Sequence, residues 1–367
     1  MLTSIELYAF RNYLRERIDL DPGVNLLLGA NAQGKTNLLE AAYFGATGRS
    51  PRSAVLSEMI MWEQVGARVL ADFGDGETEH RLEVKLERDA GSPRTRRTVS
   101  LDGRPIAASA HAGRVKVVLF HPEEMTLVRG PGEPRRRLLN GLMLQAEPGM
   151  AAVLSRYTRL VEQRNQLLKR VAENLEPVSA LDWWTEEVAR AGGEIMGRRQ
   201  RCLDGLSPLV AQRYSDIAGG EDLRVAYAPS VALGGDPAEA LAAELRGRLR
   251  EELARGLTVA GPHRDDITFV LGGLPAAAHA SQGQQRTAIL AFKLAEVDTL
   301  SASGMPPVLL LDDVMSELDA PRRAHLLEMV ELAPQSLITS AESGYFPASF
   351  LARVRPRHVV DGRLVLD

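Results

Sequence analysis

Two short motifs at opposite ends of the 367-residue chain constrain its fold more than any other feature. The first fits the pattern G-x-x-x-x-G-K-[ST] and comprises Gly29, Ala30, Asn31, Ala32, Gln33, Gly34, Lys35 and Thr36. The second is the apolar run 308–311, followed by Asp312 and Asp313. Such motifs line a single site in phosphate-binding α/β proteins. Because most of the chain lies between them here, we predict an α/β unit that is interrupted by a large insertion.

The first motif has the surroundings of a phosphate-binding loop. Residues 24–28 have the apolar composition of a buried strand, and a helix is predicted from Asn37 onward. Glycines let successive backbone N–H groups turn toward phosphate oxygens, and the N-terminus of the helix favours an anion. Lys35 would neutralise the β- and γ-phosphates, and Thr36 would ligate Mg²⁺. We therefore predict that residues 29–36 bind ATP together with Mg²⁺.

The second motif places two carboxylates at the end of a predicted parallel strand. Asp312 would belong to the Mg²⁺ shell, and Asp313 would polarise the attacking water. Taken alone, an apolar strand that ends in Asp-Asp is as typical of a simple turn. Combined with the Lys35 motif it indicates hydrolysis, so Lys35, Asp312 and Asp313 are the predicted catalytic residues.

Composition is that of a folded protein with room for two lobes. The chain is 45% hydrophobic and 25% charged, and it lacks an apolar run long enough for a membrane helix. Its one cysteine, Cys202, cannot form an internal disulfide, and the first 20 residues carry charges where a signal peptide needs an apolar stretch. We therefore expect a cytoplasmic protein with no membrane partner. The net charge of −4 means that any nucleic-acid surface must be a local patch.

The pattern along the chain predicts three segments. Residues 1–122 and 255–367 are the expected halves of an α/β head, with strands at 4–10, 68–73, 81–87 and 98–101 in the first half. Residues 123–254 are the expected second lobe, which is mostly helical. Within it, apolar residues recur at steps of four and three from Met150 to Val171, interrupted by Arg164, and again from Trp184 to Leu209. We predict a short, antiparallel, coiled-coil-like hairpin in which Trp183 and Trp184 pack.

A third candidate motif precedes an apolar helix predicted at 287–297. It contains Ser281, Gly283 and Gln284. In one interpretation Ser281 only caps the helix. In the other, Ser281 and the N–H groups around Gly283 bind the γ-phosphate held by a second subunit. Asp319 suits an N-cap for a helix at 320–330.

Arginines form two clusters that are candidates for DNA contacts. They are Arg94, Arg96 and Arg97 in a basic loop or hairpin tip, and Arg135, Arg136 and Arg137. A solvated turn is the alternative interpretation of the first cluster. The polar run 261–266 includes His263 and Arg264, for which an architectural and a functional role are equally open.

Taken together, these motifs resemble the RecF family of ABC-type ATPases, which are related to the SMC and Rad50 heads. The resemblance extends over essentially the whole chain. It rests on residues 10–13, the Lys35 loop, 120–124, 157–169, 261–266, the Ser281 motif and 309–319.

The resemblance implies an α/β fold of the ABC-head type with mixed sheets and flanking helices. It also implies an ATP-dependent homodimer that binds double-stranded DNA near gaps, hydrolyses ATP slowly with stimulation by DNA, and works with RecR and RecO to place RecA on single strands. Carried over by position, Asn31 lines the phosphate loop. Ser281, Gly283, Gln284 and Asp319 would act across the dimer.

The chain departs from the family pattern at several positions. Ala32 replaces a common glycine, Pro51 replaces a residue that is often histidine, and Asn140 stands where an acid is common. Asp313 occupies the position where transporter ATPases carry glutamate. Two alternatives to a repair ATPase are an ATP-gated DNA clamp with negligible hydrolysis and a transporter subunit. The insertion of roughly 130 residues argues against the transporter.

Overall fold

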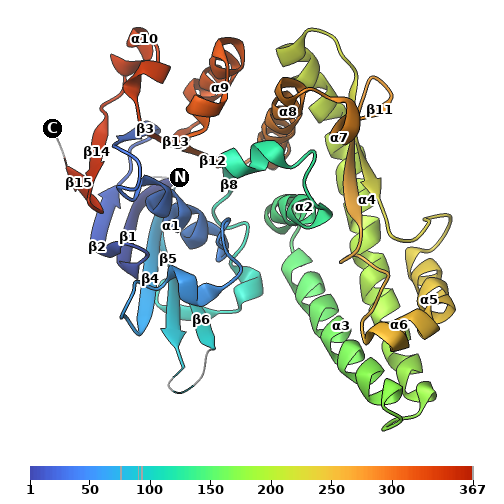
Figure 1. The fold of residues 1–367 in the computed structure, drawn as a ribbon. Coiled ribbons are helices and arrows are strands. Elements are labelled where there is room, and N and C mark those ends of the chain that lie inside the picture. Colours follow the sequence, from blue (N-terminus) through green and yellow to red (C-terminus); the bar gives the residue numbers. More distant parts are fainter. Residues whose placement is uncertain (75–76, 90, 92–93, 366–367) are drawn as a thin grey trace. The chain divides into compact units, whose positions relative to one another are not determined.

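The computed structural model describes residues 1–74, 77–89, 91 and 94–365 of the chain. These residues form two compact units (Figure 1). Unit 1 comprises residues 1–125 and 296–367, and unit 2 comprises residues 126–295. The second boundary differs from the predicted one at 254/255, because the segment 255–295, with the Ser281 motif, packs within unit 2. The boundary therefore falls inside helix α8 (Gln282–Ser301).

Unit 1 contains two six-stranded sheets. The first is antiparallel, with the order β2-β1-β4-β5-β6-β7. The second has the order β15-β14-β3-β13-β12-β8 and is parallel except for the edge pair β14 and β15. The strands are β1 (Leu2–Phe10), β2 (Tyr13–Asp19), β3 (Gly23–Leu28), β4 (Gly66–Gly74), β5 (Glu79–Arg88), β6 (Thr95–Leu101), β7 (Arg104–Ile106), β8 (Val117–Phe120), β12 (Val308–Asp312), β13 (Gln335–Ser340), β14 (Arg357–Val360) and β15 (Arg363–Val365).

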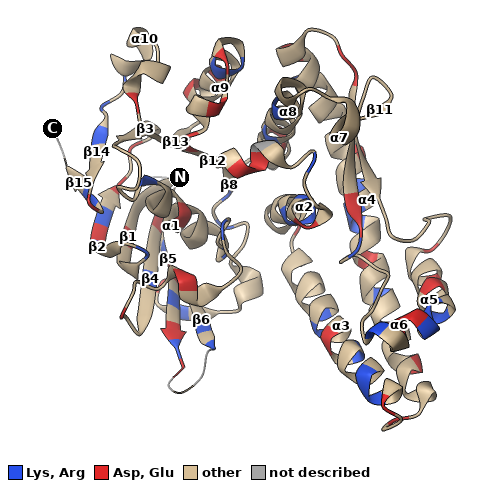
Figure 2. Ribbon diagram, viewed as in Figure 1, with Lys and Arg blue, Asp and Glu red and all other residues tan. Residues whose placement is uncertain are grey.

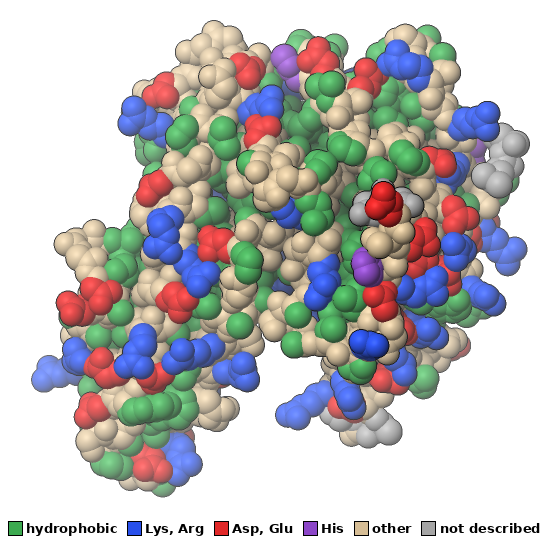
Figure 3. Space-filling view, turned by 180° about the vertical axis from the view of Figure 1, so that it is seen from behind, with side chains coloured by type: hydrophobic (Ala, Val, Ile, Leu, Met, Phe, Trp, Pro, Cys, Tyr) green, Lys and Arg blue, Asp and Glu red, His purple; other side chains and the backbone are tan. Residues whose placement is uncertain are grey.

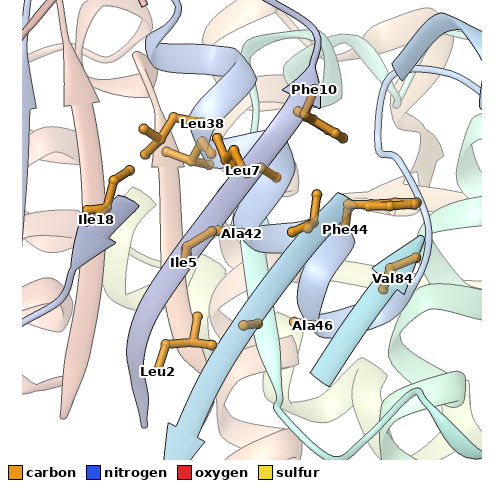
Figure 4. Close-up of a cluster of buried hydrophobic side chains, with 14 of the residues drawn as sticks. Leu2, Ile5, Leu7, Phe10, Ile18, Leu38, Ala42, Phe44, Ala46 and Val84 are labelled. Atoms are coloured by element: carbon orange, nitrogen blue, oxygen red, sulfur yellow. The ribbon is translucent and has the colours of Figure 1, made fainter. Parts of the chain in front are cut away.

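Helix α1 (Lys35–Thr47) contacts strands of both sheets. Its small and apolar residues, among them Leu38, Ala42 and Phe44, are buried against side chains such as Leu7 and Val84 (Figure 4). A helix that is buried on several faces needs apolar residues around most of its circumference, as the sequence of α1 provides. This packing fixes the N-terminus of α1 at the end of β3. Unit 1 also contains α9 (Ala320–Leu332) and α10 (Ala348–Leu351).

Unit 2 is mostly helical, as predicted. Its helices are α2 (Gly132–Ala146), α3 (Met150–Ala172), α4 (Leu181–Ala218), α5 (Pro237–Gly247), α6 (Leu249–Arg255), α7 (Ala276–His279) and the first part of α8. It also contains an antiparallel sheet of β9 (Leu223–Ala228), β10 (Asp266–Leu271) and β11 (Leu274–Pro275), ordered β11-β10-β9. Strand β9 lies within the lobe 123–254 that was predicted to be mostly helical; its residues Leu223 and Val225 are buried and alternate with exposed residues.

Helices α3 and α4 form the predicted antiparallel hairpin, and Tyr157, Leu168 and Val171 of the predicted seam are buried. Farther along α4 the seam shifts. Leu203, Leu206 and Val210 are buried, whereas the predicted Leu209 is 37% exposed. A straight helix drifts by about 20° per heptad from a 3.5-residue repeat, which explains a shift of one residue after several turns.

Arg164 does not interrupt the packing of the hairpin but is its most deeply buried polar residue. Its guanidinium forms two hydrogen bonds, of 3.0 and 2.6 Å, with the carboxylate of Glu252 in α6. It also donates to the hydroxyls of Thr185 in α4 and Thr258, at 3.3 and 3.0 Å. Both charged side chains are fully buried. The hydrogen bonds satisfy the charge that would otherwise make this position unfavourable.

Both tryptophans at the start of α4 were predicted to pack in the hairpin, but only one of them is half-buried. Their rings meet edge to face, with centroids 4.8 Å apart. Trp184 is half-buried, but Trp183 is 60% exposed, so only Trp184 contributes to the packing of unit 2.

Candidate nucleotide-binding site

The phosphate-loop motif lies in unit 1, between the end of β3 at Leu28 and the start of α1 at Lys35. Two of its residues have left-handed backbone conformations, Ala32 with φ 66° and Gly34 with φ 109°. Gly34 adopts such a φ without strain, and a Cβ at this position would lie 2.6 Å from the Asn12 side chain. At Ala32 the left-handed conformation costs roughly 1–2 kcal/mol. The alanine that departs from the family pattern is thus a strained position of the loop.

Lys35 is folded back onto its own loop. Its Nζ donates to the carbonyl oxygens of Gly29 and Ala30, at 2.6 and 2.9 Å, and the residue is only 6% exposed. Burial lowers the pKa of the Lys35 ammonium, while Asp313 and Asp312 act in the opposite direction. The cation is therefore held inside the loop by neutral oxygens, which an anionic ligand would replace.

The structure brings the two distant motifs together at Thr36 and Asp312. The Thr36 hydroxyl donates to Oδ1 of Asp312 at 2.9 Å, although the residues are 276 positions apart in the chain. The same oxygen accepts a 2.9 Å hydrogen bond from the hydroxyl of Thr339, which faces Asp312 on the neighbouring strand β13. Nε2 of His121 lies 3.4 Å from Oδ2 of Asp312. Asp312 thus stands at the centre of a polar cluster at the end of the parallel strands.

Asp313 follows directly and has a left-handed backbone, with φ 49°. Its N–H is shared between the carbonyl and the hydroxyl oxygen of Thr339, both at 3.1 Å, and its carboxylate accepts a hydrogen bond from the Ala341 N–H at 3.3 Å. Burial raises the pKa of the Asp313 carboxyl, and Lys35 counteracts this shift. A carboxylate with a raised pKa, held beside a lysine, suits a group that accepts a proton.

His121 and Thr339 are members of this cluster that the sequence did not assign to it. Their position follows from the strand order β13-β12-β8, which places the residue after β8 and a residue of β13 on either side of Asp312. A polar residue directly after an apolar run, as at His121, is the signal that indicates such a position.

Two other segments of unit 1, the start of β2 and the β14–β15 turn, hold the phosphate loop. The hydroxyl of Tyr13 donates to the carbonyl of Gly34 at 3.0 Å. On the other side, the turn between β14 and β15 donates two hydrogen bonds to Gln33. The N–H of Asp361 donates to its side-chain oxygen at 2.6 Å, and the N–H of Gly362 donates to its carbonyl at 3.0 Å.

The Ser281 motif forms a reciprocal cap at the start of α8 in unit 2. The backbone N–H of Ser281 donates to Oε1 of Gln284 at 2.8 Å, and the N–H of Gln284 donates to the Ser281 hydroxyl at 3.2 Å. The Gln284 amide also donates to the Glu221 carboxylate at 2.9 and 3.0 Å. Ser281 is therefore the N-cap that one interpretation predicted, and its exposed position leaves the second interpretation available.

Asp319 caps α9. Its side chain accepts a hydrogen bond from the Arg322 N–H at 3.2 Å and pairs with the Arg322 guanidinium. The capping interpretation is thus realised in the structure. The Asp319 carboxylate is 51% exposed.

The six candidate arginines differ in accessibility. Arg135 is buried and forms a bidentate pair with Asp266, at 2.8 and 2.6 Å. Arg136 donates to the carbonyl of Asp265 at 2.6 Å, and half-buried Arg97 donates to the carbonyl of Gly48. Only the remaining three are exposed, namely Arg94, Arg96 and Arg137. Of the basic loop 91–97, Ser92 and Pro93 lie outside the described residues.

Charge on the described elements is mixed in sign. Lys and Arg lie among Asp and Glu along α5 and α6, whereas α3 carries five basic residues and one acidic residue, Glu162 (Figure 2). On the face shown in Figure 3, basic and acidic side chains are interspersed.

His263 is tied into the interior of unit 2. Its Nδ1 accepts a hydrogen bond from the Tyr157 hydroxyl at 2.7 Å, and its Nε2 donates to the carbonyl of Thr258 at 3.0 Å. Burial lowers the pKa of the His263 imidazole, in agreement with this neutral tautomer. The contacts favour the architectural role. Arg264 is exposed, and Asn140, where the family often has an acid, accepts a hydrogen bond from buried Arg199 at 3.1 Å.

A pocket of about 550 Å³ lies at the opposite end of β3 from the phosphate loop. Its lining includes Gly23 and Val24 of β3 and three arginines, Arg353, Arg355 and Arg357. It does not include any residue of the predicted site. Among the described residues, no helix is both long and apolar enough to span a membrane.

Comparisons with known proteins agree with this arrangement of motifs. Residues 1–355 match the family model of the RecF/RecN/SMC N-terminal domain. The chain is 40% identical to the DNA replication and repair protein RecF of Chloroflexus aurantiacus, over 98% of this chain and 97% of that protein. It is 41% identical to the RecF of Symbiobacterium thermophilum, over 93% and 91% of the two chains.

Solved structures extend the comparison to the fold. A structure of the recombination mediator protein RecF-ATPrS in the RecFOR pathway is similar with a TM-score of 0.89 and 29% identity, covering 99% of this chain and 97% of that one. An Smc head domain from Pyrococcus furiosus shares the fold, with a TM-score of 0.53 and 16% identity. The predicted fold class is confirmed. The chain belongs to the RecF/RecN/SMC family and, within it, to the RecF proteins of DNA replication and repair.

Proposed function

We propose that this protein is a recombination mediator of the RecFOR pathway that binds and slowly hydrolyses ATP. The observation that carries the proposal is the hydrogen bond between Thr36 and Asp312, which joins the phosphate loop to the second motif across 276 residues. Relatives named as RecF, and a solved RecF structure described with an ATP analogue, support the choice of nucleotide. The cytoplasm, predicted from the sequence, is the compartment in which such a mediator would act.

The residues present fit a Mg²⁺ ion. A threonine hydroxyl and a carboxylate converge at 2.9 Å in the structure, and both are oxygen ligands of the kind that Mg²⁺ takes. Thr36 and Asp312 would hold the ion, with His121 and Thr339 orienting the carboxylate. When bound, the ion would neutralise charge on the β- and γ-phosphates.

The chain's own groups then have distinct tasks. The Lys35 ammonium would exchange its carbonyl partners for phosphate oxygens, while the N–H groups of 30–36 surround the phosphates. Asp313, with its raised pKa, would orient a water molecule and accept its proton. Lys35 would thus serve ATP binding and Asp313 would serve hydrolysis, so mutations at the two residues should have separate effects.

We further propose that Ser281, Gly283 and Gln284 complete the site of a second subunit, and that Asp319 lies at the same interface. A helix N-terminus attracts an anion, and in a two-fold dimer each Ser281 would meet the partner's nucleotide. Turnover per subunit is then expected to rise with protein concentration until the dimer saturates.

The test is the variant Ser281→Arg, compared with Ser179→Arg at an exposed position before α4. Ser281→Arg is expected to bind ATP as a monomer but to lose ATP-dependent dimerisation in sedimentation and, with it, turnover. Ser179→Arg should behave as the parent. Mixing Lys35→Ala with Ser281→Ala should restore part of the activity, since one site of each mixed dimer is intact. A fully active Ser281→Arg protein with concentration-independent turnover would refute the shared site.

The proposed ligand is double-stranded DNA near a single-strand gap, and this DNA would stimulate ATP hydrolysis. RecR and RecO would act together with this protein to place RecA on single strands. ATP-dependent DNA binding is expected to be sensitive to salt, because phosphate contacts release counterions. Arg94, Arg96 and Arg137 are the exposed candidates; Arg135 is excluded by its burial with Asp266.

Replacing Arg94, Arg96 and Arg137 by glutamine is expected to flatten the plot of log affinity against log salt by about one unit for each DNA phosphate that an arginine no longer binds. Fluorescence anisotropy with a gapped duplex, in the presence of ATP, measures this slope. Arg224→Gln, at a 75% exposed side chain in unit 2, is the matched control. An unchanged slope in the triple variant would assign the DNA surface to other residues.

A further inference from the structure

The β14–β15 hairpin is a two-residue hairpin built for a tight turn. Val360 pairs with Arg363, and the two residues between them, Asp361 and Gly362, have φ values of 47° and 70°. Two successive left-handed residues define the turn that best matches the twist of the flanking strands, and Asp-Gly is a preferred sequence for it. The β14–β15 connection is therefore a regular tight turn.

The base of the hairpin is fixed to unit 1 on both strands. Val359 is fully buried in the core, and β14 pairs with the last residues of β3. On β15, half-buried Leu364 packs against the hydrophobic core, and β15 lies against β2. The hairpin is thus anchored to both sheets of the unit, and its turn is held at a set position beside the phosphate loop.

This turn binds the loop at Gln33, through the two hydrogen bonds of 2.6 and 3.0 Å described above. A Cβ on Gly362 would lie 3.1 Å from the side chain and the carbonyl of Asn12, so the turn also fits closely against the β1–β2 connection. The contacts join residues that are more than 320 positions apart. They leave Gln33 with little freedom to move.

Gln33 directly follows Ala32, whose left-handed backbone is strained in any residue with a Cβ. A strained conformation persists only where its surroundings hold it. Within the loop, the two bonds from the hairpin turn act on the residue next to the strain. The Ala32 side chain has no polar group, so it cannot form a hydrogen bond that would hold its own backbone in place.

We propose that the β14–β15 turn is a positioning element for the nucleotide, which holds the phosphate loop in its binding shape through Gln33 against the strain at Ala32. The inference rests on the proposed binding of ATP by this loop. Gln33, Asp361 and Gly362 are positioning residues and do not take part in the chemistry. Loosening them should therefore weaken ATP binding without slowing the step that follows it.

The first experiment is a double-mutant cycle at Gln33 and Ala32, with ATP affinity measured by calorimetry in the presence of Mg²⁺. Gln33→Ala removes one of the two bonds and is expected to raise the Kd for ATP about fivefold. Ala32→Gly removes the strain, and its own Kd completes the cycle. In the Gln33→Ala background, Ala32→Gly is expected to restore the Kd to within about twofold of the parent, because a relaxed loop no longer needs to be held.

The second experiment compares two glycines in equivalent hairpin turns. Gly362→Ala and Gly273→Ala both place a Cβ on a left-handed residue, with φ 70° and 83°. A Cβ on Gly273, between β10 and β11, meets no atom within 4 Å, whereas one on Gly362 meets Asn12. We expect an increase of about tenfold in the Kd for ATP with Gly362→Ala and parental affinity with Gly273→Ala. At saturating ATP, turnover of both variants should equal that of the parent.

The outcomes separate this inference from the function on which it rests. If the parent protein itself does not bind ATP, the proposed function fails. If the parent binds ATP and Gln33→Ala and Gly362→Ala bind it equally well, the positioning role is overturned. Weaker binding that Ala32→Gly does not rescue also overturns it, because a general loss of structure at the hairpin would then explain the effect.

Discussion

Lys35→Ala is expected to abolish ATP binding at ordinary nucleotide concentrations, with a rise in Kd of at least about a hundredfold. The ammonium is the only side-chain cation among residues 29–36, and without it the charge of the β- and γ-phosphates is unneutralised. Calorimetric titration with ATP and Mg²⁺ measures the loss. ATP-dependent dimerisation and turnover should disappear with it.

The control for this variant is Lys85→Ala, on the antiparallel sheet, where the lysine side chain is 44% exposed and paired with Glu87. Thermal unfolding of both variants checks the fold, because Lys35 also satisfies the carbonyls of Gly29 and Ala30. Parental ATP affinity in a folded Lys35→Ala protein would remove the phosphate-loop assignment.

Asp313→Asn is expected to retain ATP binding and the ATP-bound dimer but to lower kcat by a factor of about 10²–10⁴. An amide still fills the space and accepts the Ala341 N–H, but it cannot take a proton from water. Single-turnover hydrolysis separates this loss from product release. Parental hydrolysis by this variant would assign the proton acceptor to another group.

The pH dependence of turnover gives a second test of Asp313. The acceptor must be ionised, and burial raises the pKa of this carboxyl above its ordinary value. Turnover is therefore expected to fall on acidification at a higher pH than it would with an exposed aspartate. The residual activity of Asp313→Asn should lack this acidic limb.

Local patterns predicted the parts of the site that are contiguous in the chain. The phosphate loop, the strand before it and Asp312 are each defined by a run of neighbouring residues, and the structure places them as expected. The roles of Lys35, Asp313, Ser281 and Asp319 remain predictions. The capping geometry of Ser281 and Asp319 was one of two alternatives in each case.

Features that depend on strand order or on a distant partner were not predicted. His121 and Thr339 meet Asp312 only because β8 and β13 flank β12. Arg135 looks like an exposed cation in its arginine run, and its burial is decided by Asp266, 131 residues away. Strand β9 is short, and the helices on either side of it obscured its alternation of buried and exposed residues.

The ion pair of Arg164 determines how the helical hairpin of unit 2 can move. A helix that slides along its partner by one turn travels about 5.4 Å. Such a step would take the guanidinium away from acceptors on α4, on α6 and at Thr258 at the same time, leaving two buried charges unmatched. Sliding of α3 past α4 is thereby opposed, so we expect any displacement of the hairpin to move both helices together.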